Sequence, residues 1–165
     1  CQSQRQRQLR LRGKLPGVIA AVVTRVCLAD REDWLDMRMR MWPGNSRAEF
    51  AEDIAVFLAA ERAPAAWIAR SSEGYPMGFA ETDVRSYAEG CDGPAAYLEG
   101  IWVEPQWRRG GVGRALLAAV ETWARDLGFR EMGSNALIGN RLSHDWHRDA
   151  GFAEVERLVV FRKQL

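Results

Sequence analysis

Hydrophobic and polar positions along this chain of 165 residues follow two different periods. Alternating or continuous apolar runs, rich in branched and aromatic residues, predict strands over 22–28, 65–71, 77–85, 95–103, 130–137 and 152–163. Helical spacing and capping residues predict helices over 30–41, 46–62, 113–127 and 140–150. The order βααβββαβαβ predicts an α/β (α+β) fold, with a mixed sheet flanked by helices.

The helix ends are marked by residues with clear physical reasons. Ser46 and Glu49 have the spacing of a capping box, and Asn140 is typical of an N-cap. Pro43 cannot continue a helix, while Gly128 and Gly151 stand where left-handed C-terminal residues are expected. These signals fix the helix boundaries more firmly than the strand boundaries.

Composition favours one globular domain over residues 18–165. A hydrophobic content of 47% and seven tryptophans suffice for a packed core. Residues 1–17 differ, because they are basic and poor in apolar residues, and we interpret them as a disordered tail, an upstream extension or a cloning remnant. Without the five bases before residue 15, 18 bases face 22 acids, so the folded part is mildly acidic.

Cysteine usage bears on the compartment and on metals. Cys1, Cys27 and Cys91 are odd in number and lack CxxC spacing, which argues against a disulfide framework or a zinc site. A reducing cytoplasm fits best. No segment approaches the ~18–20 apolar residues of a membrane span.

The most informative segment is "WRRGGVGRALL", residues 107–117, which follows the predicted strand 95–103. The first N–H groups of a helix have no partners and its dipole favours anions, so a strand, a glycine bend and a helix predict a phosphate site. Arg108 and Arg109 add positive charge. Neither GxxxxGK[ST] nor GxGxxG fits the spacing. The alternative is an ordinary tight turn between strand and helix.

Arg108, Gly111 and Gly113 match the R/Q-x-x-G-x-G/A signature, and the chain thereby resembles the GNAT superfamily of N-acetyltransferases. The resemblance implies a splayed central sheet and a cradle for the pyrophosphate of acetyl-coenzyme A (acetyl-CoA). It also implies that the strand before the cradle binds the pantetheine arm and offers an N–H to the thioester oxyanion. The implied coenzyme-binding residues are Ile101, Trp102, Val103, Arg108, Arg109, Gly110, Gly111, Val112, Gly113 and Asn140.

Acidic residues dominate positions 73–104, which hold seven acids and a single base, Arg85. A charge run of this kind is usually a solvated face. Glu99 stands apart, because it lies in an otherwise apolar strand two residues before the expected pantetheine contacts. A carboxylate there could hold and deprotonate a cationic amine beside the thioester.

Short matches in order, including "MWPG", "YAEGCD", "LEGIWV" and "SN…N..SH..H..AGF.E.ER", resemble the aminoglycoside 6'-N-acetyltransferases from about residue 24 to 163. The resemblance implies that an antibiotic pocket is lined by Trp42, Tyr87, Glu99 and Glu156. Carboxylates suit the ammonium groups of a polycationic sugar, and aromatic faces suit its rings and cations. Trp42 and Tyr87 could instead be core packing.

Two further positions bear on the chemistry. His147 stands where many superfamily members carry a tyrosine that protonates the departing thiolate, although it could simply pack or contact the coenzyme. His144, three residues earlier, is a surface neighbour and not a metal signal. Asn135 replaces the aspartate common in the aminoglycoside branch, and an amide supplies hydrogen bonds without charge.

Together these features predict a cytoplasmic enzyme that moves acetyl from acetyl-CoA to the 6'-amine of an aminoglycoside and so confers resistance, with Glu99 and His147 as catalytic residues. We expect a small polycationic substrate, no metal, no nucleic acid, no membrane and a homodimer. One alternative is an acetyltransferase for another amine, such as a polyamine or a protein N-terminus. The other is a non-catalytic module that binds acetyl-CoA.

Overall fold

Five strands form one sheet in the order β1–β2–β3–β4–β5 in a computed structural model that describes residues 20–165. The predicted tail, residues 1–17, lies outside the described residues. The first four strands pair antiparallel, and β5 joins β4 in parallel. The strands are β1 (Val22–Arg25), β2 (Ala65–Arg70), β3 (Pro76–Arg85), β4 (Ala95–Val103) and β5 (Met132–Ser134).

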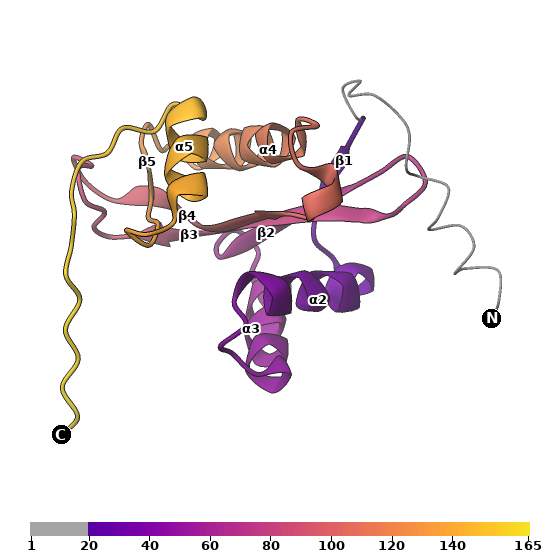
Figure 1. The fold of residues 1–165 in the computed structure, drawn as a ribbon, viewed down its shortest axis with the longest axis horizontal. Coiled ribbons are helices and arrows are strands. Elements are labelled where there is room, and N and C mark those ends of the chain that lie inside the picture. Colours follow the sequence, from indigo (N-terminus) through magenta and orange to yellow (C-terminus); the bar gives the residue numbers. More distant parts are fainter. Residues whose placement is uncertain (1–19) are drawn as a thin grey trace.

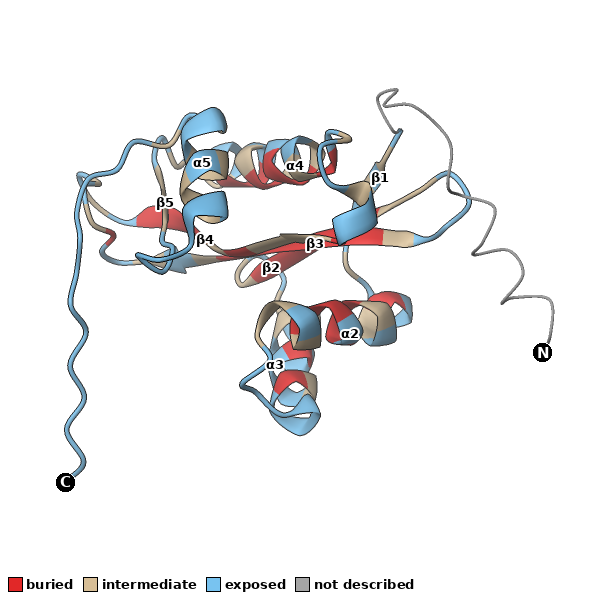
Figure 2. Cartoon of the chain, in the orientation of Figure 1, coloured by how far each residue is buried: buried red, intermediate tan, exposed pale blue. Residues whose placement is uncertain are grey.

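Helices cover both faces of this sheet (Figure 1). Below it in this view lie α2 (Arg31–Met41) and α3 (Arg47–Ala59), and above it lie α4 (Val112–Asp126) and α5 (Arg141–Asp149). Figure 2 shows the buried residues on the strands and on the helix sides that face them. The α/β class is confirmed, and none of the helices in residues 20–165 has the length and apolar character needed to span a membrane.

Each face of the sheet has its own core, because strand side chains alternate between faces. Trp67, Leu98 and Val120 belong to the cluster under α4, and Trp34 and Phe79 belong to the cluster over α2 and α3. The capping box predicted at the start of α3 is confirmed. The Ser46 hydroxyl accepts from the Glu49 N–H, and the Glu49 carboxylate accepts from the Ser46 N–H.

The sheet splays between β4 and β5. The two strands pair only at Ala96–Met132, Tyr97–Gly133 and Leu98–Ser134. Beyond Leu98, β4 continues to Val103 while β5 has ended, so the last part of β4 has a free edge on this side. We call the divergence at Leu98 and Ser134 the fork.

The predicted last strand, 152–163, is wrong, and the predicted order holds only as far as α5. Residues 152–165 contain no strand and run away from the sheet as an extended arm (Figure 1). A strand needs a neighbour for its N–H and C=O groups, and the arm has none within the described chain. The strand predicted over 130–137 is likewise reduced to the three residues of β5 that β4 can pair.

Candidate active site

The bend between β4 and α4 has the conformation of an anion cradle. Arg109 has a φ of +63° and Gly111, the N-cap of α4, has a φ of +88°. Left-handed residues among right-handed ones turn successive N–H groups toward one point, which forms a nest for anions. A Cβ built on Gly111 would meet nothing within 4 Å. The glycine therefore serves the backbone conformation and leaves the approach to α4 open.

Gly113 has a different role from Gly111. A Cβ at Gly113 would lie 3.1 Å from Trp146 Nε1 and 3.7 Å from a Val103 methyl group. The residue lets the first turn of α4 pack closely against α5 and β4. The two glycines of the signature thus serve conformation and packing respectively.

Arg108 lies over the free edge of β4. Its Nε donates to the Val103 carbonyl at 2.9 Å, and its guanidinium carbon lies 5.0 Å from the centroid of the Trp102 ring. The arrangement places a fixed positive charge between the cradle and the strand. It joins the predicted coenzyme residues of β4 to those of the bend.

Glu99 occupies a β-bulge immediately beyond the fork. Thr82 pairs with Leu98 and Glu81 with Gly100, so Glu99 is the extra residue of β4. Its carboxylate accepts two hydrogen bonds from Arg85, at 2.9 Å from Nε and 2.7 Å from Nη2. About a third of each side chain remains exposed, at 38% for Arg85 and 31% for Glu99. A bulge redirects a side chain, and here it brings the carboxylate to the surface beside the free edge.

Arg85 also lies over the Tyr97 ring, with its guanidinium carbon 3.4 Å from the ring centroid. Burial raises the pKa of Tyr97, while Arg85 and a hydrogen bond from Asn135 act to lower it. Arg85, Tyr97, Glu99 and Asn135 therefore form one cluster beside the fork, which we call the fork cluster. It combines one carboxylate, one guanidinium and an aromatic face.

Trp42 approaches the fork cluster from α2. A Cβ built on Gly100 would lie 2.7 Å from the Trp42 ring, so this glycine allows the indole to lie against β4. The Trp42 ring packs against Phe50 and Phe79, with centroids 6.1 Å apart in both pairs. The core-packing interpretation of Trp42 thus has a structural basis, and its place in an antibiotic pocket stays a prediction.

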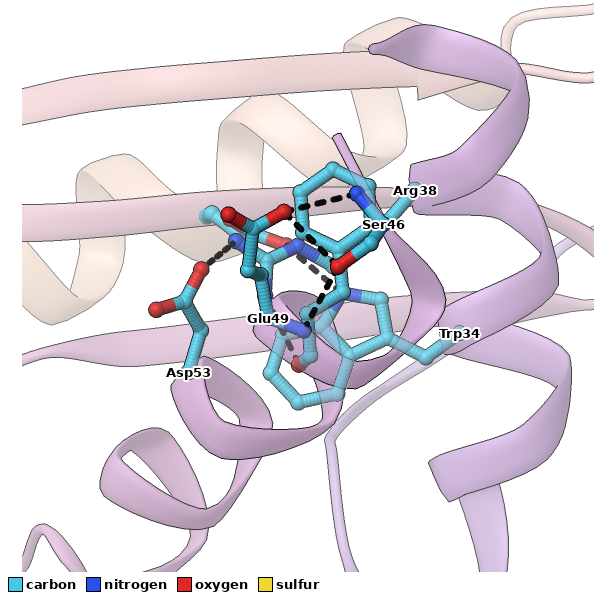
Figure 3. A network of polar contacts seen from close by, with 7 residues as sticks. Trp34, Arg38, Ser46, Glu49 and Asp53 are labelled. Atoms are coloured by element: carbon cyan, nitrogen blue, oxygen red, sulfur yellow. Dashed lines mark hydrogen bonds and ion pairs between the residues drawn. The ribbon is translucent and has the colours of Figure 1, made fainter. Parts of the chain in front are cut away.

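Arg38, whose guanidinium lies beside the Trp42 ring, belongs to a polar network that also includes Trp34 and Asp53 (Figure 3). Arg38 Nη2 donates to Asp53 at 3.1 Å, and Arg38 Nε lies 3.1 Å from Glu81 Oε1. Trp34 Nε1 donates to the same Glu81 oxygen at 2.7 Å. The guanidinium carbon of Arg38 is 4.5 Å from the Phe50 centroid and 5.5 Å from the Trp42 centroid.

Glu81 is the most perturbed acid of this network. Burial raises its pKa from 4.5 to about 7, against the lowering effects of Arg38 and the Trp34 N–H. The charged neighbours Asp53 and Glu99 raise it further. Glu81 of β3 pairs with Gly100 of β4. It therefore lies across from the residue that follows Glu99 in the bulge.

His147 is held at the fork by hydrogen bonds on both ring nitrogens. Nδ1 lies 2.7 Å from the Ser143 carbonyl, and Nε2 lies 2.9 Å from Ser134 Oγ. The ring packs edge-on against Trp146 and Phe152, with centroids 5.0 and 5.2 Å apart. This position combines the packing interpretation with a polar contact to β5.

The other predicted residues lie apart from these contacts. Asn140 caps α5, since its Oδ1 accepts from the Ser143 N–H at 3.1 Å. Tyr87 is exposed in the loop after β3, and Glu156 is exposed on the arm. A Cβ on Gly90 would lie 2.8 Å from Val155, so the arm begins against the loop that carries Tyr87.

Sequence reasoning missed Arg85, Ser134 and the Arg38–Glu81 pair as parts of the site. Arg85 had a visible signal, because it is the single base among seven acids in residues 73–104. Ser134 and Arg38 had none, since their roles depend on contacts with distant segments. Within residues 20–165 no group of three or more His, Cys, Asp or Glu side chains could hold a metal ion.

The chain belongs to the acetyltransferase (GNAT) family, whose sequence pattern it matches over residues 31–152. It is 43% identical to an aminoglycoside N(6')-acetyltransferase type 1 from Klebsiella aerogenes, over 82% of this chain and 91% of that protein. It is 38% identical to a protein of the same name from Stenotrophomonas maltophilia, over 88% of this chain and 95% of that protein.

A solved structure gives the same relation. The fold superposes on AAC(6')-Iy in complex with the bisubstrate analog CoA-S-monomethyl-acetylneamine with a TM-score of 0.83 and 34% identity, over 88% of this chain and 99% of that one. The splayed sheet and the cradle of this chain are therefore features of a fold that holds coenzyme A in a relative.

Proposed function

We propose that this protein transfers the acetyl group of acetyl-CoA to the 6'-amine of an aminoglycoside and thereby confers resistance. The single observation that carries the proposal is the free edge of β4, which runs from the anion cradle at its far end back to the partly exposed carboxylate of Glu99 at the fork. Relatives over most of the chain length have names with this activity. Acetylation removes a cation that the antibiotic uses to bind RNA.

The coenzyme fits the cradle side of the fork. Its pyrophosphate would lie against the bend at Gly110, Gly111 and Val112, with Arg108 and Arg109 supplying charge. The pantetheine arm would pair with the free edge of Ile101, Trp102 and Val103 as an added strand. An N–H of that edge would stabilise the oxyanion. Asn140 would contact the coenzyme through its N–H₂ group, because its carbonyl oxygen caps α5.

The acceptor fits the other side. Glu99, through water, would take the ammonium proton of the substrate, and Arg85 would release the carboxylate as the cationic substrate replaces it. Trp42, Tyr87, Asn135 and Glu156 would line the antibiotic pocket. His147 would assist the departure of the thiolate.

The direct test is a coenzyme A release assay with kanamycin, tobramycin and gentamicin as acceptors. Spermine and a short peptide serve as the competing amines, and a reaction without amine gives the background. We expect release well above background with the aminoglycosides and acetylation at the 6'-nitrogen by mass spectrometry. Faster release with spermine or the peptide would assign the protein another amine, and no release with any amine would favour a binding module.

We also propose a homodimer joined through the C-terminal arms. Val160 and Phe161 are each 90% exposed, and Val155, Leu158, Val159 and Leu165 of the arm are exposed as well. Such apolar surface is unfavourable in water and indicates a partner. β5 lies at the edge of the sheet, so its outer side could pair with the arm of a second copy. In such a dimer, we expect the arm to bring Glu156 to the acceptor side of a fork.

We also propose a cytoplasmic location, which the two described cysteines support. Cys27 is exposed and Cys91 is partly buried, and neither forms a disulfide within residues 20–165. Free thiols are typical of a reducing compartment, so we place the protein in the cytoplasm, where its substrate acetyl-CoA is made.

A further inference from the structure

Ser134 joins three elements at the fork. It is the last residue of β5, its hydroxyl donates to the Leu98 carbonyl of β4 at 3.1 Å, and the same oxygen lies 2.9 Å from His147 Nε2 of α5. Ser134 is only partly buried, whereas Leu98 beside it is buried. Its hydroxyl is therefore the polar group at the point where the strands separate.

The groups that can only accept hydrogen bonds limit where the protons lie in this chain of contacts. The Ser143 carbonyl can only accept, so its 2.7 Å contact with His147 Nδ1 is a hydrogen bond when Nδ1 carries the proton, and the Ser143 hydroxyl lies 3.3 Å from the same nitrogen. The Leu98 carbonyl also can only accept, so the single Ser134 hydroxyl proton points to it. Ser134 Oγ must then accept from Nε2, which requires a proton on Nε2 as well.

A proton on each ring nitrogen satisfies the contacts with Ser143 and Ser134 when the Ser134 hydroxyl donates to Leu98. When Nε2 loses its proton, the Ser134 hydroxyl can instead turn and donate to Nε2. The hydroxyl thus has two orientations that depend on the proton at Nε2. This is the property of a group that passes a proton on without holding a charge itself.

The fork is also where the reaction would occur. The cradle lies beyond the far end of β4, and the free edge runs from there back to Leu98. A coenzyme with its pyrophosphate on the cradle and its pantetheine along this edge would bring its thioester to the fork. Glu99 on β4 and Asn135 after β5 flank the same point.

We propose that Ser134 is a catalytic residue that protonates the leaving thiolate and is itself reprotonated by His147; the inference rests on the acetyl transfer proposed above. The amine nitrogen forms a bond to the acetyl carbon and the C–S bond breaks. The sulfur takes the Ser134 hydroxyl proton, and Ser134 Oγ takes the proton of His147 Nε2. The ammonium substrate loses two protons to Glu99 and solvent, and His147 regains one, so one proton is released in each turnover.

The test compares single-turnover acetyl transfer in Ser134→Ala, Ser134→Thr and the wild type. We expect Ser134→Ala to lower the transfer rate by roughly 10², the lower end for losing an acid–base group, with little change in the dissociation constants of acetyl-CoA and acceptor. Ser134→Thr keeps a hydroxyl and should retain most of the rate. Thr122→Ala is the matched control, because it deletes a hydroxyl that donates to the Ala118 carbonyl on α4, away from the fork.

A double-mutant cycle distinguishes a proton relay from His147 through Ser134 to the thiolate from two independent effects of these residues. If Ser134 and His147 act in one chain, Ser134→Ala combined with His147→Gln should be no slower than the slower single variant. Multiplied losses would overturn the relay. A Ser134→Ala transfer rate within about threefold of the wild-type rate would also overturn the relay. A loss in acetyl-CoA affinity as large as the loss in transfer rate would overturn it too, because it would mean that Ser134 only holds the strands together.

The relay and the proposed substrate can fail separately. All acceptors expel the same thiolate, so the Ser134 comparison uses whichever acceptor reacts fastest, including water. An enzyme that prefers spermine would contradict the aminoglycoside assignment and leave the Ser134 comparison valid. An aminoglycoside acetyltransferase that is insensitive to Ser134→Ala would contradict the relay alone.

Discussion

At the residue scale, the Glu99 carboxylate is already paired with a cation, the guanidinium of Arg85. Arg85 binds both of its oxygens, yet the pair is exposed enough for water and a cationic substrate to compete with it. We therefore expect Glu99→Gln to lower turnover by roughly 10² while the fold and the acetyl-CoA affinity are retained. Steady-state kinetics and calorimetry measure both quantities, with Glu73→Gln, in an exposed turn, as the control. Turnover within about threefold would move the role to another carboxylate, with Glu156 next.

Asn135 is a second residue whose charge matters. Asn135→Asp adds a carboxylate of nearly the same shape to the fork cluster, where an opposite charge at about 4 Å contributes on the order of 1 to 3 kcal/mol before screening. We expect the KM for aminoglycosides to fall several-fold at low salt and less at high salt. The positive charge of Arg85 in the same cluster will neutralise part of the added negative charge. Identical KM values in both proteins at low salt would place Asn135 outside the field of the bound drug.

At the element scale, the contact between α2 and β3 makes stability depend on pH. Burial raises the pKa of Glu81 from 4.5 to about 7, so the folded protein retains a proton that the unfolded chain releases between these values. The contribution of Glu81 to stability is thus fully present below about pH 4.5 and falls by about 3 kcal/mol as the pH rises to about 7. Urea unfolding of Glu81→Gln, whatever its absolute stability, should lack this decline. Glu52→Gln, on the exposed side of α3, should keep it, and parallel pH curves for wild type and Glu81→Gln would contradict the prediction.

The bend at the start of α4 is the other element with a direct test. Gly111 has a φ of +88°, a conformation that costs a residue with a Cβ about 1–2 kcal/mol. Gly111→Val should distort the cradle and place branches where the pyrophosphate approaches, and so raise the acetyl-CoA dissociation constant at least tenfold, or ~1.4 kcal/mol. Gly44→Ala is the control, because a Cβ there meets nothing and no left-handed φ is involved. Unchanged affinity by calorimetry would remove the basis for placing the coenzyme here.

At the scale of the whole molecule, the proposed homodimer depends on the arm. If two copies exchange arms, the dimer is part of the folded state and the melting temperature rises with protein concentration. Phe161→Lys should weaken this dimer and abolish the concentration dependence, as measured by sedimentation and thermal unfolding. Val56→Lys, which changes an exposed valine of α3, is the matched control. A wild type that sediments as a monomer at all concentrations would contradict the proposal.

The sequence alone determined most of the elements up to α5 and the family signature. These depend on local rules: the capping box at Ser46, the left-handed glycines at 111, 128 and 151, and the alternation of apolar side chains along the strands. A helix N-terminus that follows a glycine bend binds anions wherever it stands in a fold. The family signature could therefore be read from residues 108–113 without the structure.

Only the tertiary structure decided what lies at the fork. The bulge at Glu99, its bond to Arg85, the contact of Ser134 with His147 and the burial of Glu81 each join segments that are 13 to 47 residues apart or depend on the packing around them. The predicted last strand shows the same limit, because its apolar pattern is real but a strand also needs a neighbouring strand. Hydrophobic pattern determines which side of a segment is buried, whereas pairing, charge state and register depend on what the rest of the chain places beside it.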